Sequence, residues 1–154
     1  MSQSGRLLGV DYGTVRVGLA VSDADRVIAS PLATYERRGR EQDAAYFRRL
    51  VDEERLVGLV VGLPVHLDGR EGIKAAEARA FGTWLTEAVQ RPVVYWDERF
   101  STVEAEGYLV SAGLTNKRRK ARRDRVAAQI LLQSYLDAGC PAETTPRPLD
   151  DPAG

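Results

Sequence analysis

The sequence predicts an α/β domain built on one mixed five-stranded β-sheet with helices on both faces. Residues 7–35 contain three short apolar stretches joined by turn signals, which is the pattern of an antiparallel meander. Two later apolar runs, at 56–64 and 92–98, each follow a segment with helical periodicity. Strands that alternate with helices favour parallel pairing, so two parallel strands are expected to extend the meander.

The first two strands are expected in a hairpin at 7–23. An apolar run ends at Asp11, a Gly-Thr turn follows, and every second residue from 17 to 21 is apolar. Residues 27–35 form the expected third strand. Pro31 lies within it and cannot donate a ladder hydrogen bond, so this strand is expected at a sheet edge or with a bulge.

Four helices are expected from the spacing of apolar residues and from capping signals. Ser101 and Glu104 form a capping-box pair that begins the third helix, and Gly139 follows the last one as a stop signal. The basic residues at 114–119 are expected in the connection between the last two helices. The expected helices span 40–56, 73–89, 101–112 and 122–138.

The length and composition are those of one ordinary globular domain. The chain has 154 residues, of which 44% are hydrophobic and 29% charged. We expect one domain at 1–138 and a proline-rich, disordered tail at 139–154. A single cysteine, Cys140, excludes an internal disulfide and a cysteine-rich zinc site. The absence of a long apolar run or a signal-peptide pattern favours a cytoplasmic location.

The formal net charge is zero, but the charges are unevenly distributed. The segment KRRKARRDR at 117–125 holds seven of the 22 basic residues. A local basic patch of this kind favours nucleic-acid binding, because each neutralised phosphate releases counterions. The alternative interpretation is a solvated charged face.

Asp11 is the first candidate site residue, because it ends an apolar strand. A buried carboxylate is costly unless it is paired or binds a metal; the alternative is an aspartate that caps a turn. Asp97 and Glu98 end the last strand, and alternation allows only one of them to share a face with Asp11. We favour Glu98, whose longer side chain can reach past the strand end, with Asp97 as the alternative.

Asp124 is the third candidate. Its neighbours at +3, +4 and +7 are Ala127, Ala128 and Leu131, so it continues the apolar face of the last helix. The alternative is a residue near the helix start that favours the macrodipole and pairs with arginines. Hard divalent cations prefer oxygen ligands such as carboxylates. Three carboxylates from distant segments therefore form a candidate site for such cations. Two such ions about 4 Å apart can activate water and stabilise the leaving oxygen of a phosphodiester.

Other catalytic chemistries have few candidate residues. His66 is the only histidine and falls in a loop, where a solvated role is favoured over a general base. Cys140 follows the end of a helix and is interpreted as a residue without a catalytic role rather than as a nucleophile. The sequence therefore favours metal-assisted phosphodiester chemistry over histidine-based or thiol chemistry.

Several ordered segments resemble the YqgF/RuvX family and together cover most of the chain. They are GVDYGT (9–14), RVGLAVSD (16–23), VGLP (61–64) with DG (68–69), DERFST (97–102) and DRVAAQILLQSYL (124–136). The resemblance implies an RNase H-like fold related to RuvC-type resolvases. It also implies a metal-dependent nuclease, using Mg²⁺ or Mn²⁺, whose catalytic and metal-ligating triad is Asp11, Glu98 and Asp124.

Two activities are attributed to this family: resolution of four-way DNA (Holliday) junctions, and trimming of the 5′ end of the pre-16S ribosomal RNA. Family members are often dimers, so a homodimer is expected. Val15, His66 and the arginine-rich segment before Asp124 depart from the family pattern and leave the substrate preference open. The candidate nucleic-acid-binding residues are Arg16, Lys117, Arg118, Arg119, Arg122 and Arg123.

Two rival functions share parts of this pattern. The Asp-x-Gly-Thr stretch also resembles the first phosphate loop of actin-like ATPases, but these need a second domain and a second phosphate loop. The basic run at 117–125 alone would suffice for a nucleic-acid-binding module without catalysis. The three carboxylates favour a nuclease over both.

Overall fold

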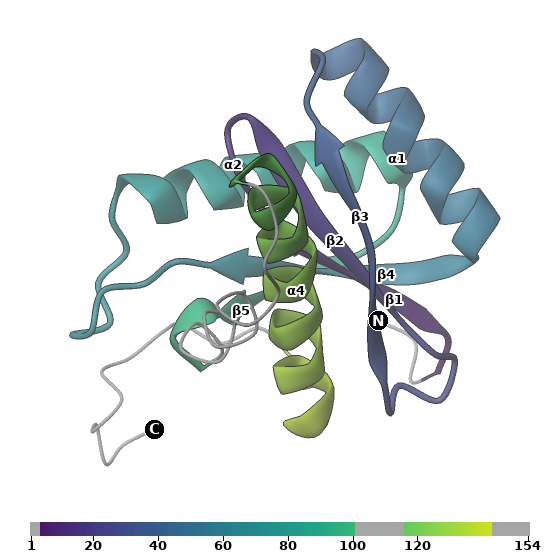
Figure 1. Cartoon of the computed structure of the whole chain (residues 1–154). Helices are drawn as coiled ribbons and strands as arrows, with labels where there is room; N and C mark the ends of the chain where they lie inside the picture. The colour runs from purple at the N-terminus through teal and green to yellow at the C-terminus, as the bar shows by residue number, and fades with distance from the viewer. Residues whose placement is uncertain (1–3, 101–115, 143–154) are drawn as a thin grey trace.

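A five-stranded sheet in the order β3-β2-β1-β4-β5 forms the centre of the computed structural model, which describes residues 4–100 and 116–142 (Figure 1). The strands are β1 (Arg6–Asp11), β2 (Arg16–Ser22), β3 (Ala29–Glu36), β4 (Leu56–Leu63) and β5 (Val93–Asp97). The helices are α1 (Arg40–Glu54), α2 (Ile73–Val89), α4 (Asn116–Asp137) and the 3₁₀ turn η1 (Glu98–Phe100).

The strand pairing confirms the mixed sheet. Strands β1, β2 and β3 pair antiparallel, whereas β4 pairs parallel to both β1 and β5. In the register, Asp11 lies opposite Gly18 of β2, and Leu63 of β4 lies opposite Asp97 of β5. The carboxyl ends of β1, β4 and β5 therefore meet at one edge of the sheet.

Strand β3 has both features expected from Pro31. It is the edge strand of the sheet, and its register with β2 shifts where Leu19 pairs with Ala33 but Ala20 pairs with Pro31. The backbone of its first residue, Ala29, is bound by α4: the Ala29 N–H donates to Gln133 Oε1 and its carbonyl accepts from Gln129 Nε2.

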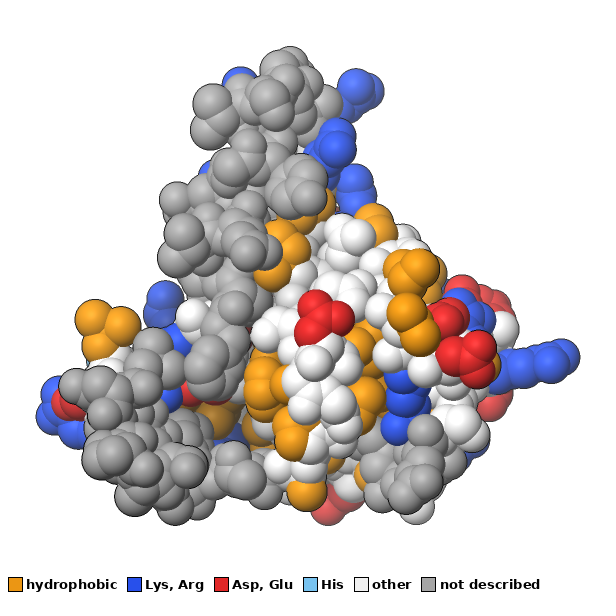
Figure 2. All heavy atoms as spheres, turned by 90° about the horizontal axis from the view of Figure 1, so that it is seen from below, with side chains coloured by type: hydrophobic (Ala, Val, Ile, Leu, Met, Phe, Trp, Pro, Cys, Tyr) orange, Lys and Arg blue, Asp and Glu red, His pale blue; other side chains and the backbone are white. Residues whose placement is uncertain are grey.

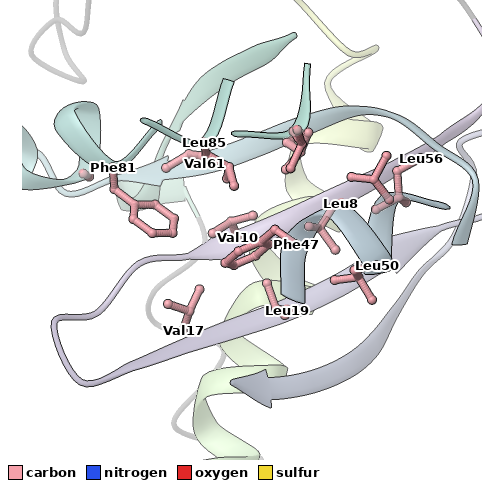
Figure 3. Packing of buried hydrophobic residues seen from close by; sticks show 14 of the residues in the cluster. Leu8, Val10, Val17, Leu19, Phe47, Leu50, Leu56, Val61, Phe81 and Leu85 are labelled. Carbon is pink, nitrogen blue, oxygen red and sulfur yellow. The ribbon is translucent and has the colours of Figure 1, made fainter. Parts of the chain in front are cut away.

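The helices form two layers, with α1 and α2 on one face of the sheet and α4 across the other (Figure 1). The alternating residues of β1, β2 and β4 divide between two cores. One core contains Val10 and Val61 with Phe47 and Phe81 from the helices (Figure 3). The other core places smaller strand residues against the apolar face of α4. Its members are Leu7, Ala20, Ala29, Val60, Ala128, Leu132, Tyr135 and Leu136.

The prediction for the last helix is wrong at its start. Helix α4 begins at Asn116 instead of residue 122, so the basic residues 117–119 are helical rather than part of a connection. The physical reason is that lysine and arginine are good helix formers, so a run of charge does not interrupt a helix. The expected helix at 101–112 and residues 143–154 of the expected tail lie outside the described residues.

No helix within residues 4–100 and 116–142 is both long enough and apolar enough to span a membrane. The longest, α4, is amphipathic and packs its apolar side on the sheet.

Asp43 is a buried charge at the start of α1, and it predicts a pH-dependent stability. Although burial opposes ionisation, hydrogen bonds from the Tyr35 hydroxyl (2.6 Å), the Arg38 backbone N–H (2.9 Å) and Arg37 hold the pKa of Asp43 below its usual value. This stabilisation is present above the unfolded-state pKa of about 3.9 and is lost as the pH falls through the lower folded-state pKa.

Asp43→Asn is therefore expected to lower the free energy of unfolding by about 1–3 kcal/mol at pH 7, because buried hydrogen bonds to a charge are lost. The difference from wild type should shrink towards pH 3. Denaturant unfolding at both pH values measures it, and an equal difference at both would contradict the role of the charge.

Candidate active site

The candidate site is built at the carboxyl end of β1, where Asp11 points to the face that α4 covers. Its neighbour Val10 belongs to the core on the opposite face, and alternation places Asp11 on the α4 side. Asp11 is half-buried there. The strand partner across from it is Gly18, where an added methyl group would overlap the backbone carbonyl oxygen of Asp124. The close approach of α4 to β2 thus requires glycine at this position.

Glu98 reaches the same place from the end of β5. It is the first residue of η1 and its side chain folds back over Gly62 of β4, where an added methyl group would overlap Glu98 Oε1. Glu98 and Asp11 form a side-chain hydrogen bond. Burial, then the negative charge of Asp11 and this hydrogen bond, raise the pKa of Glu98 to about 9. Burial raises the pKa of Asp11 as well, so ionisation of both carboxyl groups together is unfavourable at this position.

Asp97, the alternative to Glu98, has a different partner. Its buried carboxylate accepts hydrogen bonds from Arg99 Nε at 2.8 Å and from the Arg99 backbone N–H at 2.9 Å. The same guanidinium donates to the backbone carbonyls of His66 and Leu67. Asp97 thus fixes the loop after β4, while Glu98 is the carboxylate that meets Asp11.

Asp124 lies near the Asp11–Glu98 pair, but its side chain contacts a residue of β2. Its carboxylate accepts a hydrogen bond from Arg16 Nε of β2 at 2.9 Å. Its negative charge contributes to raising the pKa of Asp11, after the larger effect of burial. The macrodipole interpretation of Asp124 is wrong, because α4 begins eight residues earlier and has no acidic residue in its first turn. The expected pairing with an arginine is correct, but the partner comes from β2.

The chemistry of these residues suits a divalent cation in part. Asp11 and Glu98 present adjacent carboxyl groups joined by a hydrogen bond, and carboxylate oxygen is the ligand that hard divalent cations prefer. Within residues 4–100 and 116–142, no group of three acidic, histidine or cysteine side chains is arranged to hold a metal ion together. The carboxyl groups of Asp11 and Glu98 therefore suit a cation in their present positions, whereas Asp124 forms an ion pair with Arg16.

The sequence matches a known protein family over most of its length. A family model described as "RuvX: Holliday junction resolvase" matches residues 5–138. The chain belongs to the RuvX family. A Rhodopirellula baltica protein named "Putative pre-16S rRNA nuclease" is 47% identical over 135 residues, which cover 88% of this chain and 78% of that protein. A protein of the same name from Cereibacter sphaeroides is 47% identical over 137 residues, covering 89% and 86%.

Two solved structures resemble this RuvX-family chain in fold. Thermus thermophilus RuvC in complex with a Holliday junction superposes with a TM-score of 0.55 at 14% identity, covering 92% of this chain and 98% of that one. Fowlpox virus resolvase with its Holliday junction gives 0.54 at 11% identity, covering 89% and 100%. These similarities and the strand order confirm the expected RNase H-like, resolvase-type fold.

The basic segment 117–125 of this RuvX-family chain lies in the first half of α4. The side chains from Arg118 to Lys120 are exposed, as are those of Arg122 and Arg123, while the side chain of Lys117 is outside the described residues. Figure 2 shows several Lys and Arg side chains close together at the top of the view and others at the two sides of the molecule. Arg16, which is predicted to bind nucleic acid, contacts Asp124 and keeps 37% of its side chain exposed.

A cavity beside Glu98 was not predicted from the sequence. It has a volume of about 730 Å³ and its walls combine apolar residues with His66, Lys74 and Arg99. The imidazole of His66 lies against Gly72, where an added methyl group would approach its Nε2 to 2.8 Å. Lys74 belongs to no recognisable motif. Only the turn in the loop after β4 could have indicated that Lys74 lines a cavity together with Glu98. His66 is exposed, as expected, but it lines the space next to Glu98.

Proposed function

We propose that this chain is a divalent-metal-dependent nuclease that hydrolyses phosphodiester bonds of structured nucleic acid. The observation that carries the proposal is the contact between Asp11 and Glu98, two half-buried carboxyl groups joined by a hydrogen bond. Such a pair is unfavourable for stability and is typical of functional sites, where neighbouring charges shift pKa values. Membership of a family described as resolvases supports the same chemistry.

In this proposal Asp11, Glu98 and Asp124 are the catalytic carboxylates and hold Mg²⁺ or Mn²⁺ in a two-metal site. A bound divalent cation would supply activation of water and stabilisation of the charge that develops on the leaving oxygen. The chain itself provides the placement: Gly18 and Gly62 leave the space in which α4 and Glu98 approach Asp11. The exposed cations of α4 bind the phosphate backbone and orient it across this edge of the sheet.

The substrate is proposed from the relatives. The names of the relatives from Rhodopirellula and Cereibacter favour processing of the 5′ end of pre-16S ribosomal RNA, whereas the family description favours Holliday junctions. Both substrates require the same carboxylates and a basic surface. We further propose that the chain acts as a homodimer, because a two-fold partner would present two equivalent sites to a two-fold junction.

The basic surface gives a prediction about binding. The triple variant Arg119→Gln, Arg122→Gln, Arg123→Gln removes three exposed charges from α4. We expect weaker binding and a logarithmic salt dependence that is less steep by about one for each lost phosphate contact. Fluorescence anisotropy with a labelled nucleic acid between about 50 and 200 mM salt measures this slope.

Arg49→Gln is the matched control, because Arg49 is exposed on α1, across the sheet from α4. It should leave the slope unchanged. A triple variant with the wild-type slope would remove this surface of α4 from the binding interface.

The proposed function is tested by cleavage in Mn²⁺. A mobile four-way DNA junction is compared with a single-stranded RNA that carries the sequence of a pre-16S 5′ end, and each is also incubated with EDTA. Symmetric nicks in the junction would identify a resolvase, and trimming of the RNA alone would identify a ribosomal RNA maturation nuclease. Cleavage of neither substrate, or equal cleavage in EDTA, would contradict the proposal.

A further inference from the structure

Arg16 and Asp124 form an ion pair between segments 108 residues apart in the sequence. The backbone of Asp124 is fixed, because its carbonyl oxygen rests against Gly18 and the preceding turn of α4 accepts a hydrogen bond at Ala121 from the Thr34 hydroxyl. Only the side chain of Asp124 is therefore able to change partner. Its position in the free protein is set by Arg16, whose Nε lies 2.9 Å from Asp124 Oδ2.

Asp124 pairs with an arginine of another element rather than with one of its own helix. Asp124 is surrounded in its own helix by arginines and lysines, but the partner that holds it is a β2 residue that follows the loop after Asp11. The pairing neutralises Asp124, which is the only carboxylate of the basic segment 117–125. In this arrangement Asp11 and Glu98, whose carboxyl groups are joined by a hydrogen bond, are left for a cation.

Arg16 still has donors for a second partner. A guanidinium carries five N–H donors, and the bond to Asp124 uses Nε; the side chain of Arg16 makes no other hydrogen bond to the described residues. With 37% of its side chain exposed, Arg16 is accessible to a phosphate on the surface next to α4. Arginine binds phosphate through two parallel hydrogen bonds, which compete well with a single contact to a carboxylate.

We propose that Arg16 exchanges Asp124 for a phosphate of the nucleic-acid substrate, and that this exchange releases Asp124 as the third carboxylate of the cation site. The inference rests on the proposed function. It makes Arg16 a positioning residue that couples the two binding events. Because coupling between two binding sites is reciprocal, nucleic acid should raise the affinity for the cation, and the cation should raise the affinity for nucleic acid by the same factor.

The test measures Mn²⁺ affinity rather than cleavage. Free Mn²⁺ is titrated by its electron paramagnetic resonance signal, with and without a four-way DNA junction whose crossover linkages are phosphorothioates to suppress cutting. For wild type, the junction should raise the affinity for Mn²⁺ about tenfold, within the usual range of coupling between sites. Arg16→Gln should bind Mn²⁺ several-fold more tightly than wild type without DNA, and the junction should add little. Arg16→Lys, which can keep the ion pair, should restore most of the coupling.

Control variants separate this exchange from a simple charge effect. Arg49→Gln removes a distant positive charge and should leave Mn²⁺ affinity and its coupling to DNA unchanged. In an Asp124→Asn background, Arg16→Gln should no longer raise the affinity; an equal rise there would overturn the proposal, because it would reflect charge alone. Full coupling in Arg16→Gln, or no coupling in wild type, would also overturn this inference. Neither result would contradict the proposed nuclease function. Absence of Mn²⁺ binding to wild type in both conditions would instead overturn the proposed function together with this inference.

Discussion

Replacing Asp11 with asparagine is expected to abolish cleavage while nucleic-acid binding remains close to wild type. Asparagine fits the same space and its amide can donate to Glu98, so the fold and the basic face of α4 are preserved. The lost carboxylate removes a ligand of the proposed cation site. Such a site contributes several kcal/mol to transition-state stabilisation, so we expect a loss of about a thousandfold or more in the single-turnover rate.

Asp23→Asn is the matched control for this experiment. Asp23 follows the far end of β2, where its carboxylate accepts hydrogen bonds from the backbone N–H groups of Val27 and Ile28. Asparagine can make the same kind of turn contact, so this variant should keep full activity. If Asp11→Asn cut nucleic acid at the wild-type rate, Asp11 would have no catalytic role. If it lost binding and cleavage together, a non-catalytic role for this edge of the sheet would be favoured.

Gly18→Ala is expected to destabilise the fold strongly. The new methyl group would overlap the backbone carbonyl of Asp124, and a backbone atom in the middle of α4 cannot move aside as a flexible side chain can. Helix α4 would have to shift away from β2 and disturb the core that contains Ala128 and Leu132. We expect the free energy of unfolding to fall by about 3 kcal/mol, at the upper end of typical overpacking costs. Denaturant unfolding measures this loss.

Gly62→Ala provides the contrasting variant. Here the methyl group would overlap Oε1 of Glu98, the far end of a flexible side chain, so Glu98 can move and the loss of stability should be smaller. The displaced Glu98 would no longer meet Asp11, so cleavage should fall although the protein remains folded. A stable Gly18→Ala variant, or a fully active Gly62→Ala variant, would contradict these close approaches.

The parts of the fold that follow local patterns could be predicted from the sequence. Alternation of apolar residues indicated the meander, and it limited the neighbour of Asp11 to one of Asp97 and Glu98. The length of the Glu98 side chain favoured Glu98, and Glu98 is the residue that meets Asp11. The start of α4 was missed because charged residues were interpreted as a connection, although their helix propensity is high. The roles of Asp11, Glu98 and Asp124 as metal ligands stay predictions.

Sequence patterns could not predict the contacts between segments that are far apart in the chain. Arg16 was expected on the nucleic-acid surface, and nothing in its own strand indicated that it would pair with Asp124. The space beside Glu98 depends on how the loop after β4 packs against the start of α2, with His66 against Gly72. Periodicity describes one element at a time, so it cannot specify which residues of two elements meet.

The hydrogen bonds from α4 to Ala29 have a consequence for how copies of this chain can associate. An exposed edge strand is a template on which another strand can extend the sheet, and proteins avoid aggregation by blocking such edges. The first residue of β3 has its backbone N–H and carbonyl bound by Gln133 and Gln129, and Pro31 has no N–H to offer. This end of β3 is therefore protected against strand addition from another copy of the chain.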